Sequence, residues 1–287
     1  MRESIISIFK GLWIGGTMTV PGVSGGSMAM ILNIYDKVIY SVASFRKNPK
    51  KNLIFLLEFA IAGLVGVLIF SKYIITPLME NYPLQTGYFF LGAVAGGAPV
   101  ILKASGTTKV EFKTFVYPIV GMIPVLLIAI IPPGAFDVGN NMTFVNYIIL
   151  FFGGLFVSIP LVLPGISVSQ VLLMMGIYKT IMEALGRADF KTIFMFTPLI
   201  IGTAIGTLCV AKIMQTAIEK YHQKTYLVIF GFVLGSVPQL LVFCGLPTLK
   251  QAPVCILTAV LGFLFIYLLQ KLDVSKEKAK EKIQKQN

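Results

Sequence analysis

Two short stretches rich in glycine and serine interrupt the apolar segments of this 287-residue chain. The first is Pro21–Ser27 (PGVSGGS), and the second, Pro164–Gln170 (PGISVSQ), follows at an offset of 164 − 21 = 143 positions. Proline ends a preceding helix, glycine permits backbone conformations closed to other residues, and serine caps the helix that follows. The first N–H groups of such a helix are unpaired and bind anions, phosphate most commonly. The predicted chemistry is therefore noncovalent binding of an anion.

The candidate anion-binding residues come from both stretches, which we call the first loop and the second loop. They are the proline, glycine and serine positions, with a glutamine as a further donor: Pro21, Gly22, Ser24, Gly25, Gly26, Ser27, Pro164, Gly165, Ser167, Ser169 and Gln170. The alternative is that each loop is only a tight turn that joins two helices. A polar loop repeated in both halves of an apolar chain is typical of the broken helices at a transporter's binding site, which favours the binding role.

Several charged residues lie within or beside apolar segments. Lys72 and Lys212 occupy matching places in the two halves, where they either extend from helix ends to the lipid headgroup region or bind an anionic headgroup directly. Glu58 lies about two turns into an apolar run, and a carboxylate there either carries a coupling proton or reaches the membrane interface. We expect Asp36 and Lys37, toward the end of an apolar run, to face water.

Residue types suited to catalysis or metal binding are scarce. His222 is the only histidine and falls in a charged stretch, and the three cysteines stand singly without metal-type spacing. A membrane lipid phosphatase needs a histidine nucleophile with arginine partners, or an acidic cluster that holds a metal. We therefore expect no enzyme, no metal and no cofactor, and we disfavour a phosphatase or transferase.

The composition indicates a membrane protein. Hydrophobic residues make up 56% of the chain and charged residues 13%, with a mean hydropathy of +0.85, which is more apolar surface than a soluble protein can bury. The net charge of +12 is concentrated in Arg46–Lys51 and in the tail after Lys271. These basic residues flank apolar spans, so they indicate topology and contact with membrane lipids rather than nucleic-acid binding.

The predicted fold is an all-α polytopic membrane protein made of two repeats. Residues 1–135 form the first repeat, 136–146 an external linker, 147–271 the second repeat and 272–287 a basic cytoplasmic tail. In each repeat a hairpin of helices surrounds the loop, either re-entrant, which we favour, or as two thin full spans, and three transmembrane helices follow. Glycine and proline recur in register, as Gly92-x3-Gly96-x2-Pro99 and Gly231-x3-Gly235-x2-Pro238, which supports the repeat.

Two boundaries follow from the same pattern. The second arm of the first hairpin is expected to run as one helix from Ser27 to about Phe45, and the next span, Leu53–Ile75, is expected to close at Pro77.

The distribution of lysine and arginine sets the orientation. With Arg46–Lys51 and the lysine-rich tail in the cytoplasm, both termini are cytoplasmic and the lysine-free linker lies outside. Each repeat then crosses the membrane an odd number of times, so the two repeats are inverted relative to each other. The two loops would enter from opposite faces and meet near the middle of the membrane, which is the plan of inverted-repeat transporters.

The loops resemble those of a known family. The first loop with Ile34-Tyr35, and the start of the second loop with Ile177-Tyr178, look like the PopT family of bacterial polyprenyl-phosphate translocases, and the resemblance covers nearly the whole chain. The family's second loop reads closer to Pro-Gly-Ile-Ser-Gly-Ser, and Val168 takes the place of its second glycine. The family's motif residues carry over to Pro21, Gly22, Ser24, Gly25, Gly26, Pro164, Gly165 and Ser167.

The resemblance implies a transporter in the bacterial plasma membrane. Such a protein returns undecaprenyl phosphate, the lipid carrier of cell-wall peptidoglycan synthesis, from the outer to the inner leaflet by alternating access around a phosphate site. The residues themselves are also compatible with an alternative, a transporter of a small soluble anion. A groove open to lipid between the halves would favour the lipid, and a sealed aqueous cavity would favour the soluble anion. A homo-oligomer is left open.

Overall fold

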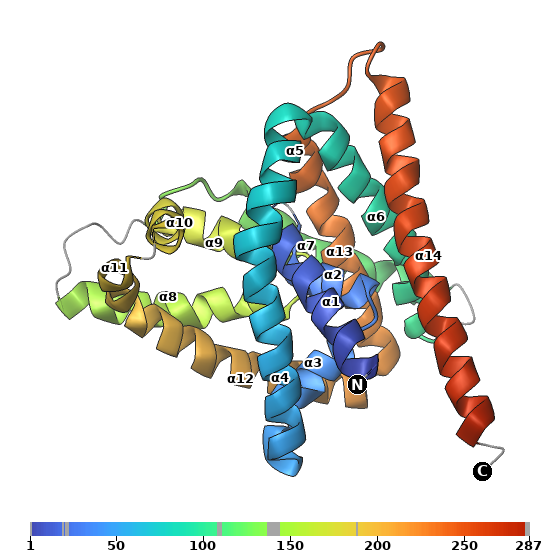
Figure 1. The fold of residues 1–287 in the computed structure, drawn as a ribbon, viewed down its shortest axis with the longest axis horizontal. Coiled ribbons are helices and arrows are strands. Elements are labelled where there is room, and N and C mark those ends of the chain that lie inside the picture. Colours follow the sequence, from blue (N-terminus) through green and yellow to red (C-terminus); the bar gives the residue numbers. More distant parts are fainter. Residues whose placement is uncertain are drawn as a thin grey trace.

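The computed structural model describes residues 2–18, 20, 23–107, 111–136, 144–187 and 189–284, and within these ranges the chain is helical with no strand (Figure 1). Six of the described helical segments are long and apolar enough to cross a membrane: Pro49–Asn81, Pro83–Ala104, Phe144–Val162, Thr197–Lys220, His222–Val242 and Ala252–Leu269. The apolar stretch Thr114–Ile130 is shorter. The protein is therefore a multi-pass membrane protein.

The first half of the chain contains short helical elements between longer helices. Its elements are α1 (Arg2–Thr17), α2 (Gly25–Ile31), α3 (Tyr35–Ala43), the short η1 (Phe45–Lys47), α4 (Pro49–Val65), the π-helical η2 (Gly66–Ile75), α5 (Thr76–Asn81), α6 (Pro83–Ala104) and α7 (Phe112–Ile130).

The second half repeats this order of elements. It contains α8 (Phe144–Val162), α9 (Val168–Met174), α10 (Tyr178–Gly186), α11 (Phe190–Met195), α12 (Thr197–Lys220), α13 (His222–Cys244) and α14 (Ala252–Gln284). Helices α9 and α10 begin and end at the same offset of 143 from α2 and α3 that separates the two loops. The repeat seen in the sequence is thus also a repeat of local structure, while its inversion across the membrane stays a prediction.

The expected single helix from Ser27 to Phe45 is wrong, because the chain turns after α2. Asn33 adopts a left-handed φ of 52°, and the Ile34 N–H bonds to the Ala29 carbonyl. Gly176 (φ 72°) ends α9 with the same pattern of backbone hydrogen bonds. This is a Schellman ending, which asparagine or glycine permits and which a following apolar residue stabilises. The sequence signal was present as an asparagine or glycine before the repeated Ile-Tyr pair.

The expected end of the first full span at Pro77 is also wrong. The helical segment that starts at Pro49 continues through η2 and α5 to Asn81. Pro77 lies in the first turn of α5, where a residue needs no N–H for the helix ladder. Proline can therefore enter the segment at this point without ending it.

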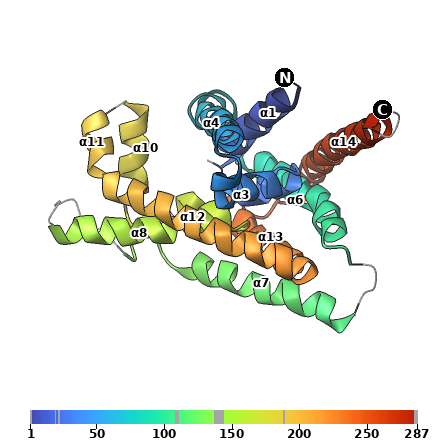
Figure 2. The same cartoon turned by 90° about the horizontal axis from the view of Figure 1, so that it is seen from below.

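Packing links the two halves of the chain. Helix α1 packs on α4 and η2, and α8 packs on α12 in the same way. By contrast, α14 packs on α6 and α7 packs on α13, so the last helix of each repeat lies against the other repeat (Figures 1 and 2). Close glycine contacts make this possible, since Gly92 touches the backbone at Ala259 and Gly121 touches the backbone at Val228. The halves are therefore intertwined.

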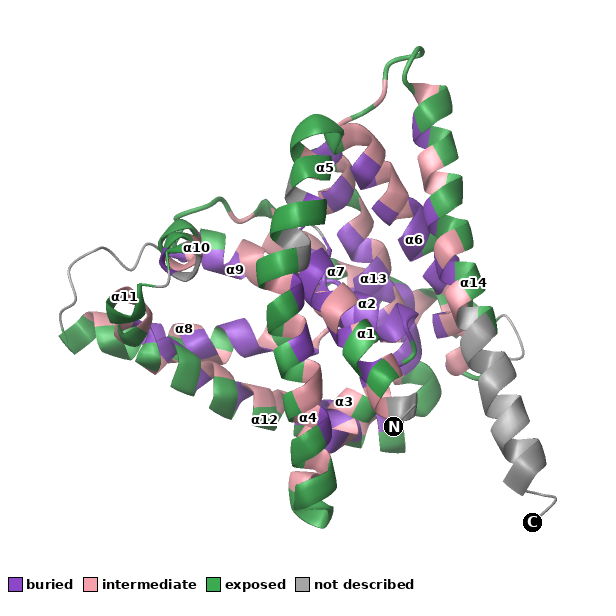
Figure 3. Cartoon of the chain, viewed as in Figure 1, coloured by how far each residue is buried: buried purple, intermediate pink, exposed green. Residues whose placement is uncertain are grey.

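Burial is concentrated around the first loop. Helix α2 and the facing parts of α1, α6 and α13 are buried, whereas α4 and α14 carry exposed residues along much of their length (Figure 3). Many of those exposed residues are apolar, Ile61 at 61% and Ile256 at 63% among them. An apolar outer surface around a packed centre is what a lipid environment permits.

Candidate functional site

The two loops are in direct contact at the centre of the molecule. The backbone N–H of Gly165 donates a hydrogen bond to Ser27 Oγ at 2.8 Å, and both residues are buried. Gly26 lies against Pro164 so closely that a Cβ on Gly26 would be 2.9 Å from the Pro164 Cα. Four residues of the predicted site are thus brought together from positions about 140 apart, with backbone against backbone.

Gly26→Ala is expected to destabilise the protein by roughly 1–3 kcal/mol. The added methyl would meet backbone atoms of Pro164, and these can move only if the whole second loop shifts. Gly63→Ala is the matched control, since the nearest atom to its Cβ is 3.7 Å away and alanine favours a helix. Thermal unfolding of both proteins in one detergent tests this. Equal melting temperatures would contradict the close contact between the loops.

Ser24 carries a buried hydroxyl without a partner. It occupies the N-cap position of α2 with extended backbone (φ −94°, ψ 134°), yet its side chain caps nothing. The residue is 1% exposed, and its Oγ forms no hydrogen bond with any described residue. A buried hydroxyl left unpaired costs about 1–3 kcal/mol, so its presence calls for an explanation, and a bound ligand is one.

Ser167 is the equivalent residue of the second loop. It has nearly the same backbone (φ −89°, ψ 131°) at the start of α9, and its Oγ lies 2.6 Å from Ser169 Oγ. Gly165 has a φ of +86° and lies against the backbone carbonyl of Phe232, so only glycine fits there. Gln170 Nε2 donates to the Ile128 carbonyl at 3.3 Å. The loops are therefore similar in backbone but differ in how their hydroxyls are paired.

The remaining predicted loop residues divide into two groups. Pro21 and Gly22 lie outside the described residues. Gly25 is half-buried, and a Cβ there would meet only the flexible side chain of Met18. Helices α2 and α9 have seven residues each. Their dipoles are therefore weaker than those expected for the longer helices that the sequence predicted after each loop. The hydroxyls and first-turn N–H groups of the loops remain as the candidate anion-binding groups.

A cavity of about 710 Å³ lies beside the second loop, between α7, α9 and α13. Ser169, Gln170 and Gln239 contribute its polar groups, and most of its other lining residues are apolar. Ile130 and Val242, which also line it, are largely exposed. Helix α7 belongs to the first repeat and the other two helices to the second. The cavity is thus an apolar groove between the halves, open sideways and polar at the loop.

A layer of hydrogen bonds joins α3 to the second repeat. Tyr35 Oη donates to the Val162 carbonyl at 3.0 Å, and Tyr226 Oη donates to Asp36 Oδ2 at 2.5 Å. At the end of α3, Gln215 Nε2 donates to Ser44 Oγ at 2.9 Å. The expectation that Asp36 faces water is wrong, because the turn at Asn33 directs α3 against α12, where the Tyr226 hydroxyl of α13 reaches Asp36.

The equivalent helix α10 is placed differently. It packs on α9 and α11 and lies at the periphery, away from α4 (Figures 1 and 2). Among the described residues its one side-chain ion pair or hydrogen bond is the exposed pair of Lys179 Nζ with Glu183 Oε1 at 3.9 Å. The two hairpins are therefore unequal: α3 is hydrogen-bonded to the second repeat, whereas α10 has no such bond to the first repeat among the described residues.

The charged residues singled out in the spans lie apart from the loops. Lys72 and Lys212 are exposed, and neither bonds to a described loop residue; Lys72 Nζ lies 5.6 Å from the centre of the Tyr73 ring. Glu58 is half-buried and lines a separate cavity near the starts of α1 and α4. His222 Nε2 lies 2.8 Å from the Ala104 carbonyl. Headgroup contact by the lysines and proton coupling by Glu58 stay predictions.

Comparison with known proteins identifies the family of this chain. The model of the VCA0040-like family, described as undecaprenyl phosphate translocase-like, matches residues 14–255. The chain is 30% identical over 281 residues to a polyprenyl-phosphate transporter of Staphylococcus aureus, covering 95% of this chain and 98% of that protein. It is 25% identical over 245 residues to a polyprenyl-phosphate transporter of Vibrio cholerae, covering 80% and 75%. No solved structure matches. The chain belongs to the undecaprenyl phosphate translocase-like family.

Proposed function

We propose that this protein transports a polyprenyl phosphate lipid, undecaprenyl phosphate in a bacterial plasma membrane, and that the two loops hold its phosphate group. The observation that carries the proposal is the buried, unpartnered hydroxyl of Ser24 close to where the loops meet. A phosphate oxygen would accept its hydrogen bond, as it would from the first N–H groups of α2 and α9. The names of the relatives from Staphylococcus aureus and Vibrio cholerae support the same substrate class.

The lipid is favoured over a small soluble anion by the groove beside the second loop. A polyprenyl chain is too long to enclose, so a carrier needs a side opening that keeps the chain in the bilayer while the phosphate enters. The groove between α7, α9 and α13 has an apolar lining, a side that reaches exposed apolar residues, and polar groups at the loop end. A soluble-anion carrier would instead enclose its substrate in a polar cavity.

The proposed direction is from the outer to the inner leaflet by alternating access. With both termini and Arg46–Lys51 in the cytoplasm, as the positive-inside rule favours, α3 would lie on the cytoplasmic side of the loops and α10 on the external side. The bonds of α3 to the second repeat then close the cytoplasmic route, while α10 leaves the external route open. In this conformation the site would accept lipid from the outer leaflet, and release requires α3 to separate from α12 and α13.

Tyr226→Phe tests the cytoplasmic closure. The change keeps the ring and removes the bond to Asp36, which contributes on the order of 1.5–3 kcal/mol because the acceptor is charged. We expect the backbone amides of α3 to exchange with deuterium faster, by roughly 10- to 100-fold. Tyr221→Phe, at an exposed tyrosine without a side-chain hydrogen bond among the described residues, is the control. Unchanged exchange in α3 would contradict the closure.

The transport activity itself is tested in proteoliposomes. Undecaprenyl phosphate is placed in one leaflet and its appearance in the other is followed, with protein-free vesicles as the baseline. Inorganic phosphate inside separate vesicles measures transport of a soluble anion by the same preparation. Protein-dependent movement of the lipid alone is expected. Movement of inorganic phosphate without movement of the lipid would overturn the proposal, as would release of inorganic phosphate from the lipid.

A further inference from the structure

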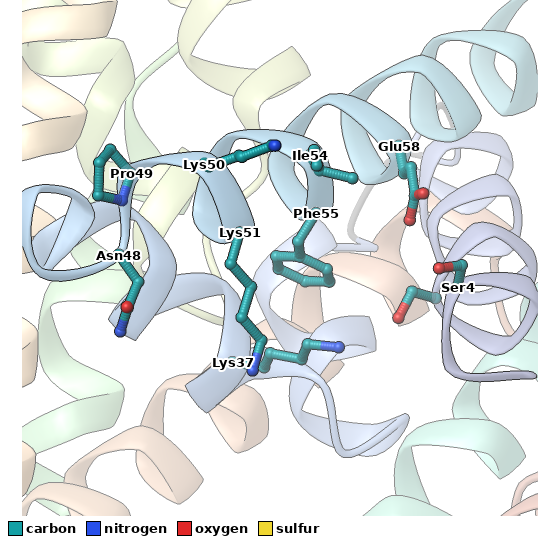
Figure 4. Close-up of a pocket in the computed structure, with 10 residues that line it drawn as sticks. Ser4, Lys37, Asn48, Pro49, Lys50, Lys51, Ile54, Phe55 and Glu58 are labelled. Carbon is teal, nitrogen blue, oxygen red and sulfur yellow. The ribbon is translucent and has the colours of Figure 1, made fainter. Parts of the chain in front are cut away.

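A second cavity, distinct from the loops, lies near the starts of α1 and α4 and beside α3. Its volume is about 530 Å³. Its polar lining residues are Ser4, Ser7, Lys37, Asn48, Lys50, Lys51 and Glu58 (Figure 4). Helix α1 packs on α4, and η1 joins α3 to α4. These three helices and the residues between them therefore supply hydroxyl, amide and ammonium donors to one site.

The cavity carries an excess of positive charge. Three lysines and one carboxylate give it a formal charge of +2. None of the three ammonium groups has a carboxylate within 4 Å among the described residues. Lys37 Nζ is held 4.4 Å from the centre of the Phe55 ring. Figure 4 shows Lys37 and Lys51 on the same side of Phe55, Lys50 turned away, and Glu58 with Ser4 at the other end.

The cavity adjoins the apolar surface of the protein. Ile54 lines it and is 50% exposed, and Leu57 on the next turn of α4 is 51% exposed. Ile5, on α1 between the two serines, is 62% exposed. Since exposed apolar side chains of a multi-pass protein face lipid chains, a ligand here would have its charged group among the lysines and an apolar chain alongside α1 and α4.

The cavity is separated from the loops by the length of α1. Ser7 lines it and Thr17 ends α1 near the first loop, so the 17 − 7 = 10 residues between them place about 15 Å of helix between the two sites. One phosphate group therefore cannot occupy both. The two sites are nevertheless linked by one rigid element.

We propose that this cavity binds the phosphate monoester headgroup of a lipid at the cytoplasmic face, as a second site that receives the headgroup after it leaves the loops. The role as a receiving site rests on the proposed function, whereas the phosphate binding does not. A phosphate monoester carries a charge of about −1.5 to −2 at neutral pH, so it is attracted more strongly by the ammonium groups of Lys37 and Lys51 than a phosphodiester lipid, which carries one negative charge. Hydroxyl and amide donors supply the hydrogen bonds of the phosphate oxygens that face away from the lysines.

The test uses farnesyl phosphate, a short polyprenyl phosphate monoester, and the whole protein in detergent, with stoichiometry and Kd measured by titration calorimetry. The wild type is expected to bind two equivalents. The double variant Lys37→Gln/Lys51→Gln is expected to bind one, with the lost site weakened at least about tenfold. Lys220→Gln/Lys250→Gln, which removes two exposed lysines elsewhere, is the charge-matched control and should keep both. Lys37→Arg/Lys51→Arg should restore the second equivalent.

Three further arms separate the explanations. Gly25→Leu should lose the loop equivalent and keep the one that depends on Lys37 and Lys51; if the wild type binds only that one, the proposed function fails and the cavity stands. If inorganic phosphate displaces farnesyl phosphate from the cavity, the cavity recognises the phosphate group alone. If inorganic phosphate does not displace it, the cavity recognises the phosphate together with its lipid chain. Two equivalents in the Lys37→Gln/Lys51→Gln protein, or equal weakening of phosphatidylglycerol binding in that protein, would overturn the proposal.

Discussion

Replacing Gly25 with leucine is expected to abolish lipid transport in proteoliposomes while the protein stays folded. Gly25 is the first residue of α2 and directly follows Ser24, so a leucine here would cover the hydroxyl and the N–H groups that the phosphate would contact. The structural cost is small because the new side chain first meets Met18, a flexible residue that can change rotamer. We expect the free energy of unfolding to change by no more than about 1 kcal/mol.

Transport and unfolding must be measured on the same preparation of the Gly25→Leu protein. Gly25→Ala provides the graded control, since a methyl group displaces Met18 without reaching over the loop, and it should keep a measurable part of the transport rate. Full activity in the leucine variant would show that the loop is a joint between helices and that the phosphate is held elsewhere. A fall in melting temperature like that of Gly26→Ala would instead show that Met18 cannot change rotamer to make room for the leucine.

The Ser24→Ala protein is expected to transport 10- to 100-fold more slowly at low lipid concentration, because a hydrogen bond to a charged phosphate contributes about 1.5–3 kcal/mol. The free energy of unfolding of the Ser24→Ala protein should rise, although its transport rate falls. The wild-type hydroxyl is buried without a partner in the lipid-free protein, so its removal relieves a desolvation cost of about 1–3 kcal/mol. A variant that is more stable and less active distinguishes a ligand-binding hydroxyl from a structural one.

Ser236→Ala is the matched control for Ser24→Ala. Ser236 is equally buried, but its Oγ donates to the Val233 carbonyl within α13, so its hydroxyl is already paired. We expect Ser236→Ala to leave transport unchanged and to gain no stability. If Ser24→Ala lowers the melting temperature and keeps the transport rate, Ser24 has a structural partner in solution and the phosphate site is not at this residue.

The repeat explains why so much of the centre could be predicted. Pairs such as Gly26 with Pro164 and Ser27 with Gly165 are far apart in the chain, yet both loops stood out as polar residues within apolar runs. Polar groups inside a membrane need hydrogen-bond partners within the protein, so two such loops of one protein are expected to lie in contact. The departures were local, at Asn33 and Pro77, where a single residue decides whether a helix ends.

The sequence by itself determined the membrane class, the duplicated order of elements and the identity of the loop residues. Those properties depend on composition and on local backbone chemistry, which are readable residue by residue. Only the tertiary structure decided that Asp36 bonds to Tyr226 and that Lys37 shares a cavity with Glu58. It also decided that Ser24 is unpaired while Ser167 is not. The physical reason is that side-chain partners depend on how helices distant in sequence pack, and two loops of nearly equal local conformation receive different neighbours when the two halves pack unequally.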